Sequence, residues 1–127
     1  MNMKKFALLL ALPLFAVACG GGETTETATL DPAAVKAGKA LFASNNCVTC
    51  HGETGEGDGL AAAGLNPKPR KYSDGAWQDS VTDDEIKKVI LLGGAANGLS
   101  ALMPANKQLE GKDADLDNIV TYIRSLK

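Results

Sequence analysis

Residues 47–51 of this chain read Cys-Val-Thr-Cys-His, and this stretch decides how the rest of the sequence is interpreted. Two cysteines three positions apart, with a histidine directly after the second, form the attachment pattern of a c-type haem. Each thiol can add to one vinyl group of the porphyrin, and the adjacent imidazole can reach the iron. We therefore expect Cys47 and Cys50 to carry one covalent haem c, with His51 as an axial ligand.

Two other kinds of Cys-x-x-Cys site are alternatives to this interpretation. A redox-active pair of the thioredoxin kind normally follows a strand in a β-α-β unit, whereas a helical pattern precedes Cys47. A zinc site normally needs four ligands, and the chain after its N-terminal segment offers only two neighbouring thiols and one imidazole. Both alternatives fit the sequence poorly, so we favour the haem.

The N-terminal residues 1–18 have the features of a signal peptide. Lys4 and Lys5 form a positively charged start, and residues 6–18 are mostly apolar. This apolar run is too short to span a bilayer as a helix. We expect the segment to direct the chain out of the cytoplasm and to be removed.

The residues around Cys19 are similar to a bacterial lipobox. They read Ala-Val-Ala-Cys-Gly over residues 16–20, with alanine where leucine is usual. We expect a lipid on Cys19, and simple cleavage after the Ala-x-Ala of residues 16–18 is the alternative. Residues 19–31, rich in Gly, Glu and Thr, would then be a flexible linker. This predicts a domain, residues 32–127, anchored on the periplasmic side of a bacterial membrane.

The net charge limits the classes of partner. The chain has 13 basic and 15 acidic side chains, and removal of residues 1–18 leaves 11 and 15, a formal charge of −4. A general nucleic-acid binder is therefore not expected, and a docking partner would present a neutral or basic face. A local basic patch of Lys68, Arg70 and Lys71 is either a solvated loop or a docking site.

Three segments have the apolar periodicity of helices. They run from Pro32 to near Asn45, from Thr82 to the pair Gly93-Gly94, and from near Asp113 to Lys127. Asp31 can cap the first helix, and Thr82 with Glu85 can form a capping box at the second. No segment alternates as a strand would. We predict an all-α domain of three main helices, with residues 52–80 and 94–111 as loops that wrap the haem.

Met103 is the natural candidate for the second axial ligand of the iron. It is the one methionine left once residues 1–18 are removed, and it stands between Leu102 and Pro104 in a loop bounded by glycine and proline. A thioether favours ferrous iron, so histidine and methionine together raise the reduction potential. The alternative, that Met103 only fills the core, fits a loop position less well.

Several of these motifs together resemble a class I, single-haem cytochrome c. They are Gly-Lys-Ala-Leu-Phe at 38–42, Cys-Val-Thr-Cys-His-Gly at 47–52, Leu-Met-Pro at 102–104, and a closing helix with Tyr122. The resemblance implies the cytochrome c fold. It also implies that the first and last helices cross, with Gly38 and Phe42 against Ile119 and Tyr122.

The resemblance further implies a set of contacts around the haem. A carbonyl from a proline-containing loop should accept the second ring N–H of the axial histidine, and Pro67 is our candidate ahead of Pro69. Tyr72 and Trp77 are candidates to donate to the haem propionates, with plain packing as the alternative for each. Arg70 is a candidate to neutralise a propionate.

A haem with both axial positions filled excludes small ligands and is left with one-electron exchange. We therefore expect an electron carrier and not an enzyme, with redox proteins as donor and acceptor and no small-molecule substrate. One alternative is a haem subunit tethered to a larger respiratory oxidoreductase. Another is a peroxidase or gas sensor in which Met103 leaves the iron open, although no second histidine is present for acid–base chemistry.

Overall fold

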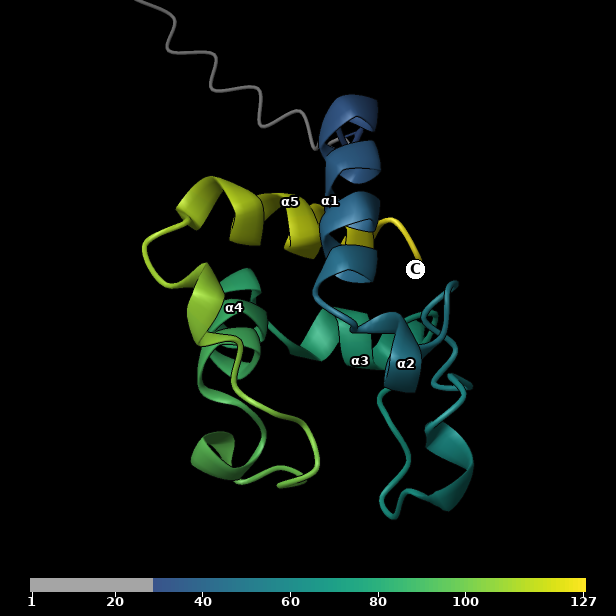
Figure 1. Cartoon of the computed structure of the whole chain (residues 1–127). Coiled ribbons are helices and arrows are strands. Elements are labelled where there is room, and N and C mark those ends of the chain that lie inside the picture. Colours follow the sequence, from purple (N-terminus) through teal and green to yellow (C-terminus); the bar gives the residue numbers. More distant parts are fainter. Residues whose placement is uncertain (1–28) are drawn as a thin grey trace, which may run out of the picture.

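The computed structural model describes residues 29–127, and Figure 1 shows its arrangement. The expected signal segment, the candidate lipid site Cys19 and most of the expected linker lie outside the described residues. The α-helices are α1 (Pro32–Ser44), α2 (Val48–His51), α3 (Gly75–Ser80), α4 (Asp83–Leu92) and α5 (Asp113–Arg124). Three 3₁₀ turns accompany them, at Ala62–Gly64, Ala95–Asn97 and Lys107–Leu109. No strand occurs in residues 29–127, so the all-α prediction is confirmed.

Helix α1 begins and ends where the sequence predicts. The carboxylate of Asp31 accepts from the backbone N–H of Ala33 at 2.9 Å, as an N-cap should. After Ser44 the chain turns through Asn46, which has a left-handed φ of 60°. The N–H of Cys47 donates to the carbonyl of Phe42 at 3.1 Å, the long bond of a Schellman motif. This turn leads α1 directly into the cysteine pair.

Helices α1 and α5 cross at very close range (Figure 1). A Cβ added at Gly38 would lie 1.9 Å from the backbone oxygen of Asn118 and 2.8 Å from Cβ of Tyr122. One turn further on, the rings of Phe42 and Tyr122 meet edge to face at 5.3 Å. The predicted crossing is confirmed, and it depends on the missing side chain of Gly38.

Helix α4 has the predicted capping box. The Thr82 hydroxyl accepts from the N–H of Glu85 at 3.3 Å, and the Glu85 carboxylate accepts from the N–H of Thr82 at 2.8 Å. The helix ends at Gly93, whose φ is 76°. Its last turn and the segment that follows it position the loop that carries Met103.

The helix α3 was not predicted, because residues 52–80 were expected to be loop. Asp74 caps it by accepting from the N–H of Trp77 at 3.2 Å. Buried Gln78 donates to the carbonyls of Tyr72 and Ile123 at 2.9 and 2.8 Å. Its side-chain and backbone oxygens accept from Arg124 at 2.8 and 2.6 Å. The prediction that α5 continues to Lys127 was also wrong, since the helix ends at Arg124.

Candidate haem site

The two cysteines and the histidine lie on a single helical turn. Cys47 is the N-cap residue of α2, and His51 is the last residue of that helix. Both thiols are free and half-buried, whereas the imidazole is only 8 % exposed. The turn therefore presents two sulfurs next to a ring that is almost fully enclosed by protein.

The imidazole of His51 is held by a backbone carbonyl. Its Nδ1 atom lies 3.1 Å from the carbonyl oxygen of Arg70. A carbonyl can only accept, so Nδ1 carries the proton and Nε2 keeps its lone pair. Burial lowers the pKa of His51, and the hydrogen bond to Arg70 partly offsets this. The ring is therefore neutral near pH 7, which is the form that binds metal ions.

The prediction that Pro67 supplies this carbonyl was wrong. The segment that follows Pro67 runs back along residues 55–57, where the N–H of Tyr72 donates to the carbonyl of Gly55 at 2.7 Å. Gly57 in turn donates to the carbonyl of His51 at 2.8 Å. This pairing aligns Arg70, and not Pro67, with the imidazole. A proline-containing loop is used as expected, but the acceptor is three residues further along it.

The environment of Cys47 keeps its thiol protonated. Burial is the main cause that raises its pKa, to about 11, so it remains a thiol at neutral pH. A thioredoxin-like pair needs a lowered thiol pKa and a preceding strand, and residues 29–127 provide neither for Cys47. Within the same range no group of three His, Cys, Asp or Glu side chains is placed to hold a metal ion. The geometry thus favours neither alternative that the motif left open.

Met103 lies in a half-buried position on a loop that is tied to the end of α4. The N–H of Gly94 donates to the Met103 carbonyl at 3.0 Å. A Cβ at Gly93 would lie 2.8 Å from the N atom of Ala105. The absence of a side chain at Gly93 therefore lets the end of α4 lie close to the backbone that follows Met103. Buried Asn106, which the sequence analysis missed, donates from its side chain to the Ile90 carbonyl at 3.1 Å. The backbone around Met103 is therefore fixed on both sides.

The segment with Met103 and the segment after α2 lie at the same end of the molecule. In Figure 1 both extend away from the crossing of α1 and α5, one on the side of α4 and the other on the side of α2. The rings of Phe42 and Tyr72 lie 6.2 and 4.7 Å from the imidazole ring of His51. The two loops that were expected to wrap the haem thus extend in the same direction from the helix crossing.

Arg70, Tyr72 and Trp77 make contacts with other protein residues in the structure. The Arg70 guanidinium lies 5.6 Å from the centre of the Trp77 ring and 3.9 Å from the carboxylate of Asp74. Tyr72 is buried and stacks on His51, a contact that was not expected. Contacts of these three residues with haem propionates stay predictions.

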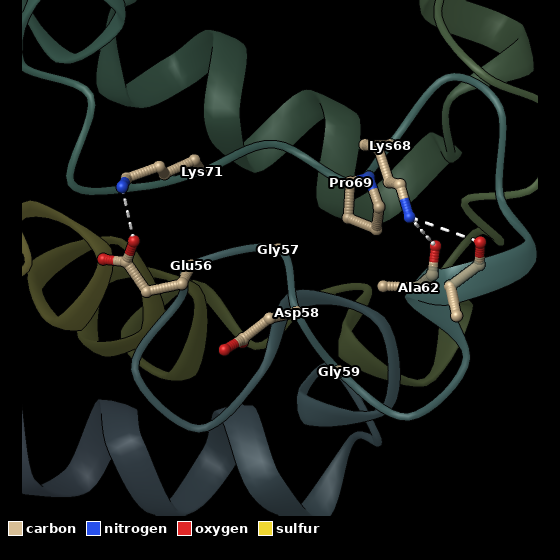
Figure 2. A pocket seen from close by; sticks show the side chains of 9 residues that line it. Glu56, Gly57, Asp58, Gly59, Ala62, Lys68, Pro69 and Lys71 are labelled. Carbon is tan, nitrogen blue, oxygen red and sulfur yellow. Dashed lines mark hydrogen bonds and ion pairs between the residues drawn. The ribbon is translucent and has the colours of Figure 1, made fainter.

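The basic patch has internal partners. Figure 2 shows a pocket of about 490 Å³ beside it, lined by residues of the loop 56–71. Lys68 donates to the carbonyls of Ala62 and Ala63 at 2.9 and 3.3 Å, and Lys71 pairs with Glu56 at 2.6 Å (Figure 2). The lysines thus hold this loop together, which favours the solvated-loop interpretation of the patch over the docking site.

Comparison with known families decides the identity of the site. The family model described as Cytochrome c matches residues 35–127. The chain belongs to the cytochrome c family. Comparisons with curated proteins and with solved structures gave no match. As in other cytochromes c, the cofactor is a covalent haem c, attached through Cys47 and Cys50 of the Cys-x-x-Cys-His motif.

The residues present fit this cofactor. Both thiols are unbridged, the imidazole is held in the neutral form with its Nε2 lone pair directed away from Arg70, and a thioether is available on an anchored loop. Cytochromes c of this family serve haem-based electron transfer, and that is the general role of this chain. No helix among residues 29–127 has the length and apolarity needed to cross a membrane.

Proposed function

We propose that this cytochrome c is a one-electron carrier whose iron is bound by His51 on one side and by Met103 on the other. When bound, the haem supplies reversible exchange between ferrous and ferric iron. The protein residues supply the two axial donors, the burial and the hydrogen bonds that set the potential. The observation that carries the proposal is the hydrogen bond between His51 Nδ1 and the Arg70 carbonyl.

That hydrogen bond supports His51 as a ligand for two reasons. It fixes the tautomer in which Nε2 carries no proton and can donate its lone pair to iron, and it makes the ring a stronger donor by drawing on the Nδ1 proton. Ligating histidines in proteins normally show such a partner on the second nitrogen. His51 is also the one histidine of the chain, so no rival imidazole exists.

Support for Met103 comes from the way its loop is built. The Gly93-Gly94 pair and Asn106 hold the backbone on either side of Met103. A methionine that only filled the core would sit among the fully buried apolar residues, whereas Met103 is half-buried. The soft sulfur would favour ferrous iron and raise the potential.

We infer that partner proteins dock on an uncharged surface near this loop. Residues 91–106 contain no charged side chain, and Leu99 and Leu102 within them are 58 and 55 % exposed. The loop at 59–67 is also uncharged and carries Leu60, which is 99 % exposed. Brief electron-transfer encounters use small interfaces, and exposed leucines supply apolar contact there without a large buried area.

We further propose that the domain is tethered by a lipid on Cys19 to the periplasmic side of a bacterial membrane. The support is the lipobox-like sequence of residues 16–20 and the polar linker that follows it. Replacing Cys19 by alanine should move the protein from the membrane fraction to the soluble fraction. Recovery of the variant in the membrane fraction would contradict the lipid anchor and leave the carrier role untouched.

Binding of small ligands separates the carrier from the alternative with an open iron. Carbon monoxide added to the reduced protein, or cyanide added to the oxidised protein, should leave the visible spectrum of the wild type nearly unchanged. The Met103→Ala variant should bind both readily. Rapid binding by the wild type at the rate of this variant would show an open site and favour a gas sensor or peroxidase. Purification from native membranes would then show whether the domain travels with a larger oxidoreductase.

A further inference from the structure

Tyr72 is in direct contact with the candidate iron ligand. Its ring stacks on the His51 imidazole with centres 4.7 Å apart and planes inclined by 12°. Its hydroxyl lies 3.3 Å from His51 Nε2. The side chain is 6 % exposed, and burial keeps its pKa well above the ordinary value, so the phenol is neutral. The electron-carrier proposal gives this residue no role.

The position of the Tyr72 ring is fixed by its own backbone. Its N–H donates to the Gly55 carbonyl at 2.7 Å, and its carbonyl accepts from the side chain of Gln78 at 2.9 Å. A Cβ at Gly55 would lie only 2.8 Å from Cδ2 of the ring, so the glycine makes room for it. The rings of Trp77 and Phe42 pack against Tyr72 with centres 5.5 and 6.1 Å away. The ring cannot turn aside without breaking several contacts.

The hydroxyl and the ring of Tyr72 differ in what they can do once iron is bound. Nδ1 of His51 donates to the Arg70 carbonyl, so Nε2 accepts from the Tyr72 hydroxyl. The iron needs the same lone pair, and the hydroxyl must give it up. Ring stacking needs no lone pair. The stack is therefore the contact that remains available in the loaded protein.

We propose that Tyr72 is a positioning residue that sets the plane of the His51 imidazole about the axis through Nε2. The Arg70 carbonyl fixes the direction of one ring atom, and the Tyr72 ring fixes the plane in which the other atoms lie. This inference rests on His51 being an axial ligand. It assigns Tyr72 a role on the ligand itself, in place of the propionate contact that the sequence suggested.

The test compares variants of the haem-loaded protein by the proton shifts of the four haem methyl groups in the oxidised state. These shifts depend on the orientation of the axial imidazole plane. Tyr72→Phe keeps the stack and should retain the wild-type order and spread of the shifts. Tyr72→Leu removes the stack and should change both. The control Tyr122→Phe loses a phenol hydroxyl that donates to the Glu53 carbonyl at 2.6 Å and not to the imidazole of His51, and it should match the wild type.

A wild-type shift pattern in Tyr72→Leu would overturn the positioning role, even if that variant were less stable. If Tyr72→Leu fails to fold, the proposal is tested instead on the reduced wild-type protein. Nuclear Overhauser contacts between the ring protons of Tyr72 and His51 support the inference, and their absence overturns it. A wild type without low-spin, histidine-bound haem would instead overturn the electron-carrier proposal, so the two failures are distinguishable.

Discussion

The Nδ1 atom of His51 lies 3.1 Å from the backbone oxygen of Arg70, nineteen residues further along the chain. The loop that joins them turns back on itself, because the backbone N–H of Tyr72 donates to the carbonyl of Gly55 and that of Gly57 donates to the carbonyl of His51. The haem motif at residues 47–51 and the loop at residues 52–72 are therefore held together by backbone hydrogen bonds. The strength of the proposed proximal ligand depends on how closely this loop can pack.

Gly57 lies where this loop packs against the segment that carries Arg70. Its φ is 74°, and a Cβ there would lie 2.6 Å from the Pro69 carbonyl oxygen, next to Arg70. We expect Gly57→Ala to lower stability by about 1–3 kcal/mol and to shift the reduction potential, because the Arg70 carbonyl is displaced. Denaturant unfolding and redox titration measure the two effects.

Gly111→Ala is the matched control for this change. Gly111 has the same φ of 74°, but nothing lies within 4 Å of an added Cβ. The control should lose stability from backbone strain without a change in potential. Equal potentials for both variants and the wild type would show that the loop does not tune the ligand.

Gly38→Ala should destabilise the crossing of α1 and α5. The added Cβ meets the backbone of Asn118, which cannot rotate away, so the helices must separate at a cost of about 1–3 kcal/mol. Gly75→Ala serves as control, since its nearest neighbour would be the flexible end of Lys127 at 3.8 Å. The control should be neutral or gain up to about 1 kcal/mol from helix propensity. Denaturant midpoints that fall equally in both would rule out the close approach as the cause.

The capping box of α4 should make stability sensitive to acid. The backbone N–H of Thr82 is the main cause that lowers the pKa of Glu85 in the folded protein. A lowered carboxyl pKa stabilises the fold above the unfolded value, about 4.3, and this contribution is lost as the pH falls through the folded value. The denaturant midpoint should therefore fall less between pH 6 and pH 3 in Glu85→Gln than in the wild type. Parallel curves for the two proteins would argue against the linkage.

A charge on the uncharged surface around Met103 should slow electron transfer to the native partner. Leu102 is 55 % exposed beside the proposed ligand, so Leu102→Asp would bury a charge at the proposed interface. We expect at least a several-fold fall in the second-order rate constant with native membranes and an unchanged visible spectrum. Leu30→Asp, at a residue 40 % exposed before α1, is the control. Equal rates for the two variants would place the docking surface elsewhere.

The parts of the fold that follow from local signals could be predicted. The residues that begin or end a helix act on backbone groups only a few positions away. The structure has helix ends at each of the predicted ones, which are Asp31 before Pro32, the pair Thr82 and Glu85, and Gly93. The site motif at 47–51 is equally local, and the family comparison confirms its cofactor. Such signals need no knowledge of the rest of the chain.

The parts that depend on distant partners were missed. Helix α3 has only six residues, and it is held by Gln78, whose partners lie on α5 and before α3. The carbonyl that holds His51 was assigned to the wrong residue, since the register of the loop against Gly55 and Gly57 leaves no trace in the sequence. Asn106 was missed for the same reason, because its side chain donates to the carbonyl of Ile90, sixteen residues earlier.

The central claim is that Met103 completes the coordination of the iron opposite His51. The most direct test is the near-infrared spectrum of the oxidised protein, where a methionine-to-iron charge-transfer band appears only when the thioether is bound. We predict this band in the wild type and its loss in Met103→Leu, with a fall in reduction potential. A wild-type spectrum that lacks the band, or a Met103→Leu spectrum that keeps it, would contradict the account.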